Sequence, residues 1–217
     1  MIPRRWHIAT NVGATAALLS AARATGMTKS QLGLDRSQVR RGAGRGLAVS
    51  AAIATTVAVV ATPRRVRPQF ADERVRAEKS REMAYETLAL ITVGTALFEE
   101  VAFRGVLSGL LLRRMAPIPA YAASATAFGL WHVLPTLNDH AGSPTAARVS
   151  PRAAVVSAVA LTAPAGLVFE GLRRSSDSLL TPILAHAALN ASAYLAAQAA
   201  HRDLARSATG EHPPEED

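Results

Sequence analysis

The chain has 217 residues, a length that suits one domain, and 49% of them are hydrophobic. It has no cysteine, which excludes disulfide bonds, thiolate metal sites and a cysteine nucleophile. Its formal net charge of +8 comes almost wholly from arginines, which cluster in pairs at the ends of apolar runs. This placement is typical of charge that flanks membrane helices, and no aromatic residues interleave the pairs as nucleic-acid binding would favour.

Six apolar stretches approach the ~20 residues that a membrane-spanning helix needs. The first two are rich in alanine, threonine and glycine, whereas the third carries three charged side chains. The sequence therefore predicts an all-α fold, a polytopic transmembrane helical bundle of about six spans. In chain order, the predicted spans are residues 6–22, 46–62, 87–112, 115–138, 153–169 and 178–200.

The chain divides into three predicted parts. Residues 1–84 combine two membrane helices with a polar connector, and residues 85–200 form a core of four further helices. Residues 201–217 end in acidic residues and prolines and are expected to be a disordered C-terminal tail. We therefore expect chemistry to reside in the middle part, which carries Glu99, Glu100, Arg104, His132 and His186 inside apolar runs.

Three segments between the spans have their own character. Residues 23–45 form the polar connector, and residues 70–86 fit an exposed or interfacial helix. Residues 139–152 contain glycine and prolines and are predicted to be a loop. The first span can also be read as a cleaved signal peptide. An uncleaved helix is favoured, because Arg23 and Gly26 lead straight into a polar loop and a second span.

Five ionisable groups stand out in the third, fourth and sixth apolar stretches, because charge at membrane depth costs several kcal/mol and marks function by default. Glu99, Glu100 and Arg104 interrupt the third span, while His132 and His186 lie in the fourth and sixth. Glu100 and Arg104 have the i,i+4 spacing at which acidic and basic side chains meet on a helix. Glu99 points about 100° away from Glu100 and is left to face a cavity as a candidate general base.

The two histidines repeat the i,i+4 spacing. Phe128 and His132 lie on one helical face, and so do His186 and Asn190. Each group has a structural interpretation: helix packing for Phe128 and the histidines, and an interhelical hydrogen bond for Asn190. These interpretations do not explain why all of them occur together on three spans. A carboxylate such as Glu99 with two imidazoles is also a workable Zn²⁺ set, so proton chemistry and a metal both remain open.

Three motifs on these spans, in order, resemble those of the CAAX protease and bacteriocin-processing (CPBP, or Abi) family. This family of intramembrane proteins is related to the CAAX prenyl endopeptidases. Residues 99–105 read EEVAFRG and are similar to its EExxxR motif. Residues 128–132, FGLWH, resemble its FxxxH motif, and residues 186–190, HAALN, resemble its HxxxN motif. The resemblance covers roughly residues 85–200, whereas the first part carries no motif.

The resemblance implies an all-helical membrane fold with a polar intramembrane cavity and an intramembrane endopeptidase activity. By position, Glu99 and His132 would activate water, and His186 and Asn190 would stabilise the oxyanion. A bound Zn²⁺, if the family mechanism uses a metal, would be held by Glu99, His132 and His186. Glu170 departs from the family pattern, which usually has an uncharged residue there. The supporting residues implied are Glu100, Arg104 and Phe128.

The implied partners are a membrane-associated peptide or protein substrate and the lipid bilayer, with no nucleic acid. The implied location is the bacterial cell membrane, as a multi-pass protein. One alternative is a non-catalytic membrane protein of the same fold that acts as a peptide-binding, scaffolding or bacteriocin-immunity protein. A proton-coupled transporter ranks last, because the chain shows no internal repeat.

Overall fold

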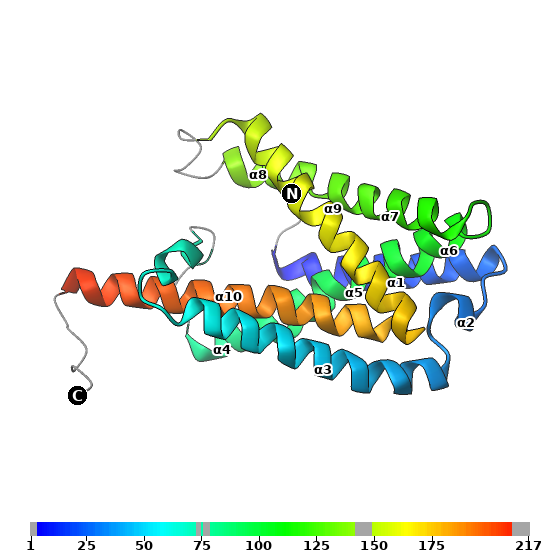
Figure 1. Cartoon of the computed structure of the whole chain (residues 1–217), viewed down its shortest axis with the longest axis horizontal. Helices are drawn as coiled ribbons and strands as arrows, with labels where there is room; N and C mark the ends of the chain where they lie inside the picture. Colours follow the sequence, from blue (N-terminus) through cyan, green and yellow to red (C-terminus); the bar gives the residue numbers. More distant parts are fainter. Residues whose placement is uncertain (1–3, 73–74, 76–78, 142–148, 210–217) are drawn as a thin grey trace.

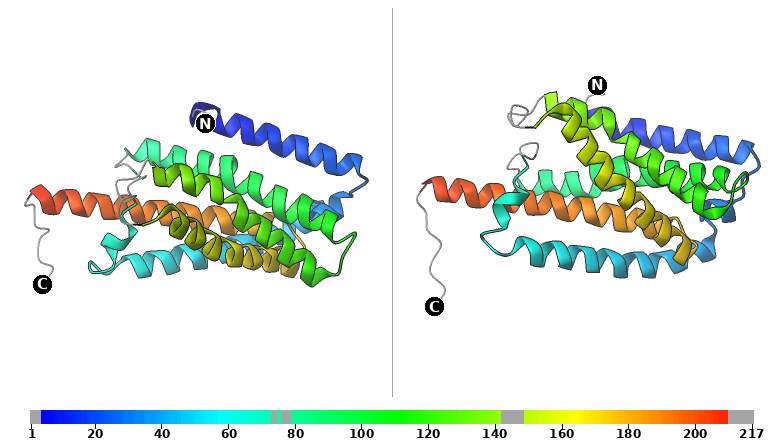
Figure 2. Two further views of the ribbon diagram at one scale, coloured as in Figure 1. Left: turned by 90° about the horizontal axis from the view of Figure 1, so that it is seen from above. Right: turned by 45° about the horizontal axis from the view of Figure 1, so that its top comes forward.

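The structure, a computed structural model, describes residues 4–72, 75, 79–141 and 149–209. All regular structure in these ranges is helical, which confirms the predicted all-α fold. Figure 1 shows the long helices lying along the long axis of the molecule, and Figure 2 shows α9 crossing its neighbours at an angle. The elements, with η1 a 3₁₀ helix and η2 and η3 π-helices, are α1 (Arg4–Ala24), α2 (Lys29–Leu32), α3 (Arg36–Ala61), η1 (Arg67–Phe70), α4 (Ser80–Tyr85), η2 (Glu86–Ala96), α5 (Leu97–Glu100), η3 (Val101–Leu107), α6 (Ser108–Leu111), α7 (Pro117–Trp131), α8 (Val133–Ala141), α9 (Pro151–Ser176) and α10 (Leu180–Thr209).

Each of the six predicted apolar stretches falls in helical structure. Among the described residues, two helical stretches, Lys29–Ala61 and Pro151–Ser176, are long and apolar enough by themselves to cross a membrane. The stretch from η2 to α6 is also helical throughout, but Glu99, Glu100 and Arg104 interrupt its apolar character. The fourth predicted span is divided at His132 into α7 and α8. The count of six spans therefore stays a prediction.

Small residues bring the long helices close together. Helix α3 packs against α10 through Gly42 and Gly46, which have the GxxxG spacing of close helix pairs in membranes. The Thr181 hydroxyl of α10 donates to the Gly42 carbonyl oxygen at 3.2 Å. A Cβ atom on Gly46 would lie 2.7 Å from a methyl of Leu184, so this contact needs glycine. Small residues thereby allow α3 and α10 to pack closely against each other.

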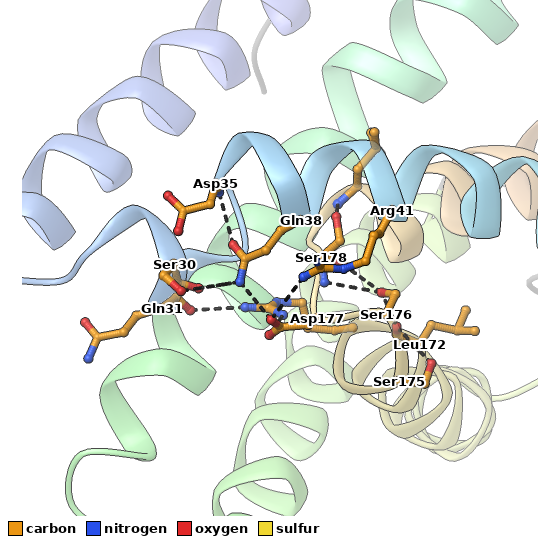
Figure 3. A network of polar contacts seen from close by, with 12 residues as sticks. Ser30, Gln31, Asp35, Gln38, Arg41, Leu172, Ser175, Ser176, Asp177 and Ser178 are labelled. Carbon is orange, nitrogen blue, oxygen red and sulfur yellow. Dashed lines mark hydrogen bonds and ion pairs between the residues drawn. The ribbon is translucent and has the colours of Figure 1, made fainter.

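A polar junction joins α2 and α3 to the end of α9 and the start of α10 (Figure 3). The turn at Gly33 has a φ of 74°, a left-handed conformation that favours glycine. Its carbonyl oxygen accepts from the Leu179 amide at 3.1 Å. The side chain of Asp177 lies 3.7 Å from both Arg41 and Arg173 and accepts a hydrogen bond from Gln38 at 3.0 Å. This junction fixes one end of the bundle.

The polar connector predicted at 23–45 is largely helical, which corrects the expectation of an irregular segment. Helix α3 already begins at Arg36, ahead of its apolar part. Asp35 and Gln38 form a capping box that satisfies the free amide groups at this end. The prediction failed because local capping and the GxxxG contact extend the helix beyond its hydrophobic residues.

Helix α10 extends to Thr209, so the first part of the tail predicted at 201–217 is ordered helix, a correction with a local cause. His201 donates from Nε2 to the Asp72 carbonyl oxygen at 2.7 Å, and Arg67 forms an ion pair with Asp203. These contacts hold the end of α10 against η1. Residues 210–217 of the predicted tail, and 142–148 of the predicted loop, lie outside the described residues.

Candidate active site

The two glutamates lie in the middle of a long helical run that changes its winding around them. Glu99 and Glu100 end α5, a short α-helical stretch between the π-helices η2 and η3, and Arg104 lies in η3. π-helical turns within a helix occur frequently at functional sites, where they re-aim side chains. All three charged side chains are buried against the helices that carry the histidine motifs.

Glu100 is the centre of a buried polar cluster. Its Oε1 accepts from Arg104 Nη1 at 3.0 Å, so the i,i+4 pair expected from the spacing is present. The same oxygen accepts from Nδ1 of His186, on α10, at 2.8 Å. A buried arginine loses its hydration, and a charge-assisted hydrogen bond to a carboxylate offsets part of that cost. Glu100 therefore holds two of the other motif residues in place.

Aromatic rings enclose the two side chains that donate hydrogen bonds to Glu100. The guanidinium of Arg104 lies 4.0 Å from the centre of the Phe128 ring and 5.3 Å from that of Phe169. The His186 ring stacks on Phe169, with centroids 4.8 Å apart and planes inclined by 16°. Cation–π contact adds about 2 kcal/mol or more where water is excluded. Phe128 of the second motif thus supports Arg104 of the first.

Exposure separates the two glutamates. Glu100 is 0% exposed, whereas Glu99 is 7% exposed and so keeps some access to water. Glu99 Oε1 accepts from the indole N–H of Trp131 at 3.1 Å. Its Oε2 lies 3.8 Å from His186 Nε2, beyond hydrogen-bond distance. One oxygen of Glu99 is therefore fixed, and the other faces an imidazole with no direct bond between them.

His132 caps the end of α7 and is half-buried. Its Nδ1 donates to the Phe128 carbonyl oxygen at 2.8 Å, and its ring packs edge-on against the Phe128 ring at 4.8 Å. A carbonyl oxygen only accepts, so Nδ1 carries a proton and Nε2 of the neutral ring is an acceptor. Within the described ranges, His132 forms no hydrogen bond to the cluster around Glu100.

Asn190 is half-buried on α10, one turn after His186. The structure therefore gathers the first motif, His186 and Phe128 in one cluster and leaves His132 and Asn190 beside it. In the part of the chain that the structure describes, no three histidine or acidic side chains lie close enough to hold a metal ion. The set Glu99, His132 and His186 does not form such a cluster here, so no step is derived through Zn²⁺, whose binding remains a prediction.

Three contacts at the site were not anticipated from the sequence. The Trp131 hydrogen bond to Glu99 had one signal, the position of this tryptophan directly before His132. The stacking of Phe169 on His186 had none, because the two lie on separate helices. Glu170, the departure from the family pattern, is buried and accepts from the Ser108 hydroxyl at 2.7 Å.

Residues 82–192 match the family described as type II CAAX prenyl endopeptidase Rce1-like, over about half of the chain. The chain belongs to this family. The matched region contains all three motifs and every candidate site residue, so it confirms the resemblance drawn from the motifs. The Rce1-like family is membrane-embedded and consists of CAAX proteases, which are peptide hydrolases. No curated protein and no solved structure matches the chain.

Proposed function

We propose that the chain is a multi-pass intramembrane endopeptidase that hydrolyses a peptide bond of a membrane-associated substrate. The observation that carries the proposal is the buried cluster in which Glu99 and Glu100 both face His186. Carboxylates and an imidazole inside apolar helices are costly to bury, and hydrolysis gives them a use that packing does not. We place the protein in the bacterial cell membrane.

The outer surface supports a multi-pass arrangement. Large apolar side chains are exposed on helices around the bundle, as in Leu47 of α3 at 63%, Leu88 of η2 at 72%, Ile118 of α7 at 82% and Leu161 of α9 at 74%. A protein in water rarely leaves so much apolar surface uncovered. Lipid tails around the bundle account for it.

In the proposed reaction, Glu99 takes a proton from a water molecule as the water oxygen bonds to the substrate carbonyl carbon. His132 assists through its free Nε2, which the hydrogen bond at Nδ1 leaves as an acceptor. The carbonyl oxygen becomes an oxyanion, which accepts hydrogen bonds from the Asn190 amide and from His186 Nε2 when both nitrogens of that ring carry protons. The C–N bond then breaks, and the proton held by Glu99 passes to the amine leaving group.

Glu100 and Arg104 are assigned to support. Glu100 has no exposed surface on which to meet water, and its Oε1 is occupied by Arg104 and His186. This position orients the His186 ring so that Nε2 points toward Glu99. The two acids therefore divide the work: Glu99 handles the proton and Glu100 holds the imidazole.

The proposal extends to substrate and metal. The family description names CAAX prenyl endopeptidases, so a farnesylated peptide that ends in a CAAX tetrapeptide is the first probe. By residue type alone, the two imidazoles of His132 and His186 and the carboxylate of Glu99 are Zn²⁺ ligands, although the three do not converge in the described residues. Elemental analysis of the purified protein before and after chelation tests that part by itself.

The test compares Glu99→Gln and Glu100→Gln in detergent, with release of the C-terminal fragment of the farnesylated peptide measured by mass spectrometry. Glu99→Gln is expected to lower turnover by about 100-fold or more, because the proton acceptor is lost while the shape is kept. Glu82→Gln, an exposed glutamate on α4, is the control and should cleave like the native protein. Unchanged turnover in Glu99→Gln would show that the water-activating role is wrong.

The same peptide without the farnesyl group separates chemistry from recognition. Equal cleavage of both peptides would support an endopeptidase that does not read the prenyl chain. If the native protein cleaves neither peptide and the Glu99→Gln protein still binds the farnesylated peptide with native affinity, the non-catalytic alternative is favoured. Binding is measured by the change in fluorescence of a dye on the peptide.

A further inference from the structure

A polar pocket lies at the end of the bundle where α2 is found (Figure 1). Arg104 is part of its lining, whereas Glu100 and His186 are not. Its volume is ≈ 230 Å³. It takes lining residues from α2, from the run η3–α6 and from the last turns of α9. The lining side chains that carry charge are Arg104, Arg113, Glu170, Arg173, Arg174 and Asp177.

Positive charge is in excess in this pocket, with four arginines against two acids. The two acids are already engaged: Glu170 accepts from Ser108 at 2.7 Å, and Asp177 faces Arg41 and Arg173 and accepts from Gln38. Figure 3 shows Gln38 and Arg41 converging on Asp177. The acids therefore do not neutralise the arginines at the mouth of the pocket.

Two exposed arginines at the pocket lack an acidic partner. Arg113 donates to the Thr25 carbonyl oxygen at 2.8 Å and to the Gln31 side chain at 3.2 Å. Arg174 lies over the Tyr121 ring, 5.0 Å from its centroid. Among the described residues, no carboxylate is within ion-pair distance of Arg113 or Arg174. Both guanidinium groups thus keep donors for a ligand from outside the chain.

The wall of the pocket gives a second and independent sign of a missing acceptor. Arg104 is 2% exposed and Arg173 is 7% exposed, so both are deeply buried. In the described part of the chain, Arg104 Nη2 and Arg173 Nε have no hydrogen-bond partner. Buried donors without partners are costly and rare in native proteins, and a polar ligand is one of the explanations for them.

The neighbourhood of the mouth identifies the class of ligand. Directly after Arg113 and Arg114, Met115 is 41% exposed and Ile118, in the first turn of α7, is 82% exposed. Guanidinium groups beside uncovered apolar side chains match a molecule that joins an anionic head to hydrocarbon. Guanidinium forks fit phosphate oxygens in a bidentate manner, and basic pockets between membrane helices bind lipid head groups.

We infer that this pocket, the α2–α9 pocket, binds the phosphate group of an anionic phospholipid through Arg113 and Arg174. Arg104 of the first motif lines the wall of this pocket, but neither Arg113 nor Arg174 belongs to a motif or contacts Glu99 or Glu100. Lipid binding alone tests this proposal, so the result of the cleavage assay does not affect it.

The test uses the full-length protein, purified in detergent, with native mass spectrometry to count the lipids that remain bound. The probes are phosphatidylglycerol and phosphatidylcholine at equal concentration, followed by inorganic phosphate as a competitor. We expect retention of phosphatidylglycerol in preference to phosphatidylcholine. The double variant Arg113→Gln and Arg174→Gln should weaken that retention at least about tenfold, as the loss of two charged hydrogen bonds requires.

The control removes the same charge outside the pocket. Arg114 and Arg40 are exposed, and neither lines the pocket, so the double variant Arg114→Gln and Arg40→Gln should retain phosphatidylglycerol within about twofold at moderate salt. Thermal unfolding by circular dichroism confirms that both variants are folded. If both double variants lose phosphatidylglycerol equally, the lipid is retained by diffuse electrostatic attraction to the basic surface, and the proposed pocket is wrong. Displacement of phosphatidylglycerol by millimolar inorganic phosphate would support a site that holds the phosphate group, whereas equal retention of phosphatidylglycerol and phosphatidylcholine would overturn an anionic lipid as its ligand.

Discussion

Two buried arginines, Arg104 and Arg173, show how one residue type serves different ends within a single helical bundle. Arg104 lies in the middle of the molecule, bonded to the carboxylate of Glu100 and enclosed by the rings of Phe128 and Phe169. Arg173 lies at one end, where it donates to the Gln31 carbonyl oxygen at 3.1 Å and faces Asp177. The first has partners that are themselves motif side chains, and the second has backbone and loop partners.

The partners of the two arginines indicate which one belongs to a catalytic site. The partners of Arg104 include an acid that also holds an imidazole, so removing the arginine disturbs an ionisable network. The partners of Arg173 join α9 to the turn between α2 and α3, so removing it loosens the fold at that end. Burial is similar in the two cases. Both arginines face a carboxylate, and what that carboxylate also holds distinguishes the site from the junction: Glu100 bonds the imidazole of His186, whereas Asp177 bonds Gln38.

The largest effect is expected from Arg104→Met. Loss of the guanidinium leaves Glu100 fully buried with His186 as its remaining hydrogen-bond partner, and breaking a buried ion pair costs about 3 kcal/mol or more. We expect that loss in the free energy of unfolding in detergent, together with loss of peptide cleavage. Adding Glu100→Gln to this variant should restore stability in part but not cleavage. A variant Arg104→Met with native stability and turnover would contradict the distinction drawn here.

Arg173→Gln should lower the free energy of unfolding by about 2 kcal/mol, because a charged hydrogen bond to a carbonyl and the contact with Asp177 are lost. Turnover per folded molecule should stay at the native value. The control is Arg174→Gln, an exposed neighbour whose stability effect should stay within about 0.5 kcal/mol. Turnover that falls as far as in Arg104→Met would place Arg173 in the site.

The comparison also shows what the sequence could and could not predict. The pair of Glu100 and Arg104 followed from i,i+4 spacing on one helix, and the helical fold followed from the apolar stretches. The bond from Glu100 to His186 joins residues 86 positions apart, and no local spacing encodes it. Its presence depends on how α10 packs against α5 and η2, which is decided by contacts between helices.

The structural junction was harder to predict than the site. The connector was expected to be irregular because its residues are polar, yet the capping box at Asp35 and the glycines of α3 make most of it helical. Arg173 gave no signal, since an arginine at a helix end is typical of membrane flanks. Motifs reveal residues used for chemistry, whereas a junction built on backbone carbonyls leaves little mark on the sequence.

Gly33→Ala probes the junction from the other side and should cost about 1 to 2 kcal/mol of stability. The φ of 74° disfavours alanine, and the added Cβ would lie 2.5 Å from Arg173 Cζ. Gly26→Ala is the control, because Gly26 has a φ of 78° but open space around its Cβ. We expect a larger loss at Gly33 in thermal unfolding. Equal losses would show that backbone conformation alone, without the contact to Arg173, explains the glycine.

The smallest effect is expected from Trp131→Phe, which removes the N–H donor to Glu99 Oε1 and keeps an aromatic ring against Phe98 and Phe103. A carboxylate that is no longer oriented should lower kcat about fivefold, equivalent to ~1 kcal/mol, with KM unchanged. Stability should change little, because Trp131 is 46% exposed. Trp6→Phe makes the same substitution on α1, away from the site, and should leave kcat at the native value.

An unchanged kcat in Trp131→Phe would mean that the indole hydrogen bond is not needed to orient Glu99, and equal losses in both tryptophan variants would point to a general effect on folding. A fall in kcat confined to Trp131→Phe would extend the network of Arg104 to a residue outside the i,i+4 pairs. That network would then run from Arg104 through Glu100 and His186 to Glu99, with the indole fixing its far end. The contacts of Arg173 instead run through Asp177 to Gln38 and Arg41, side chains that join α2, α3 and α9 and belong to none of the three motifs.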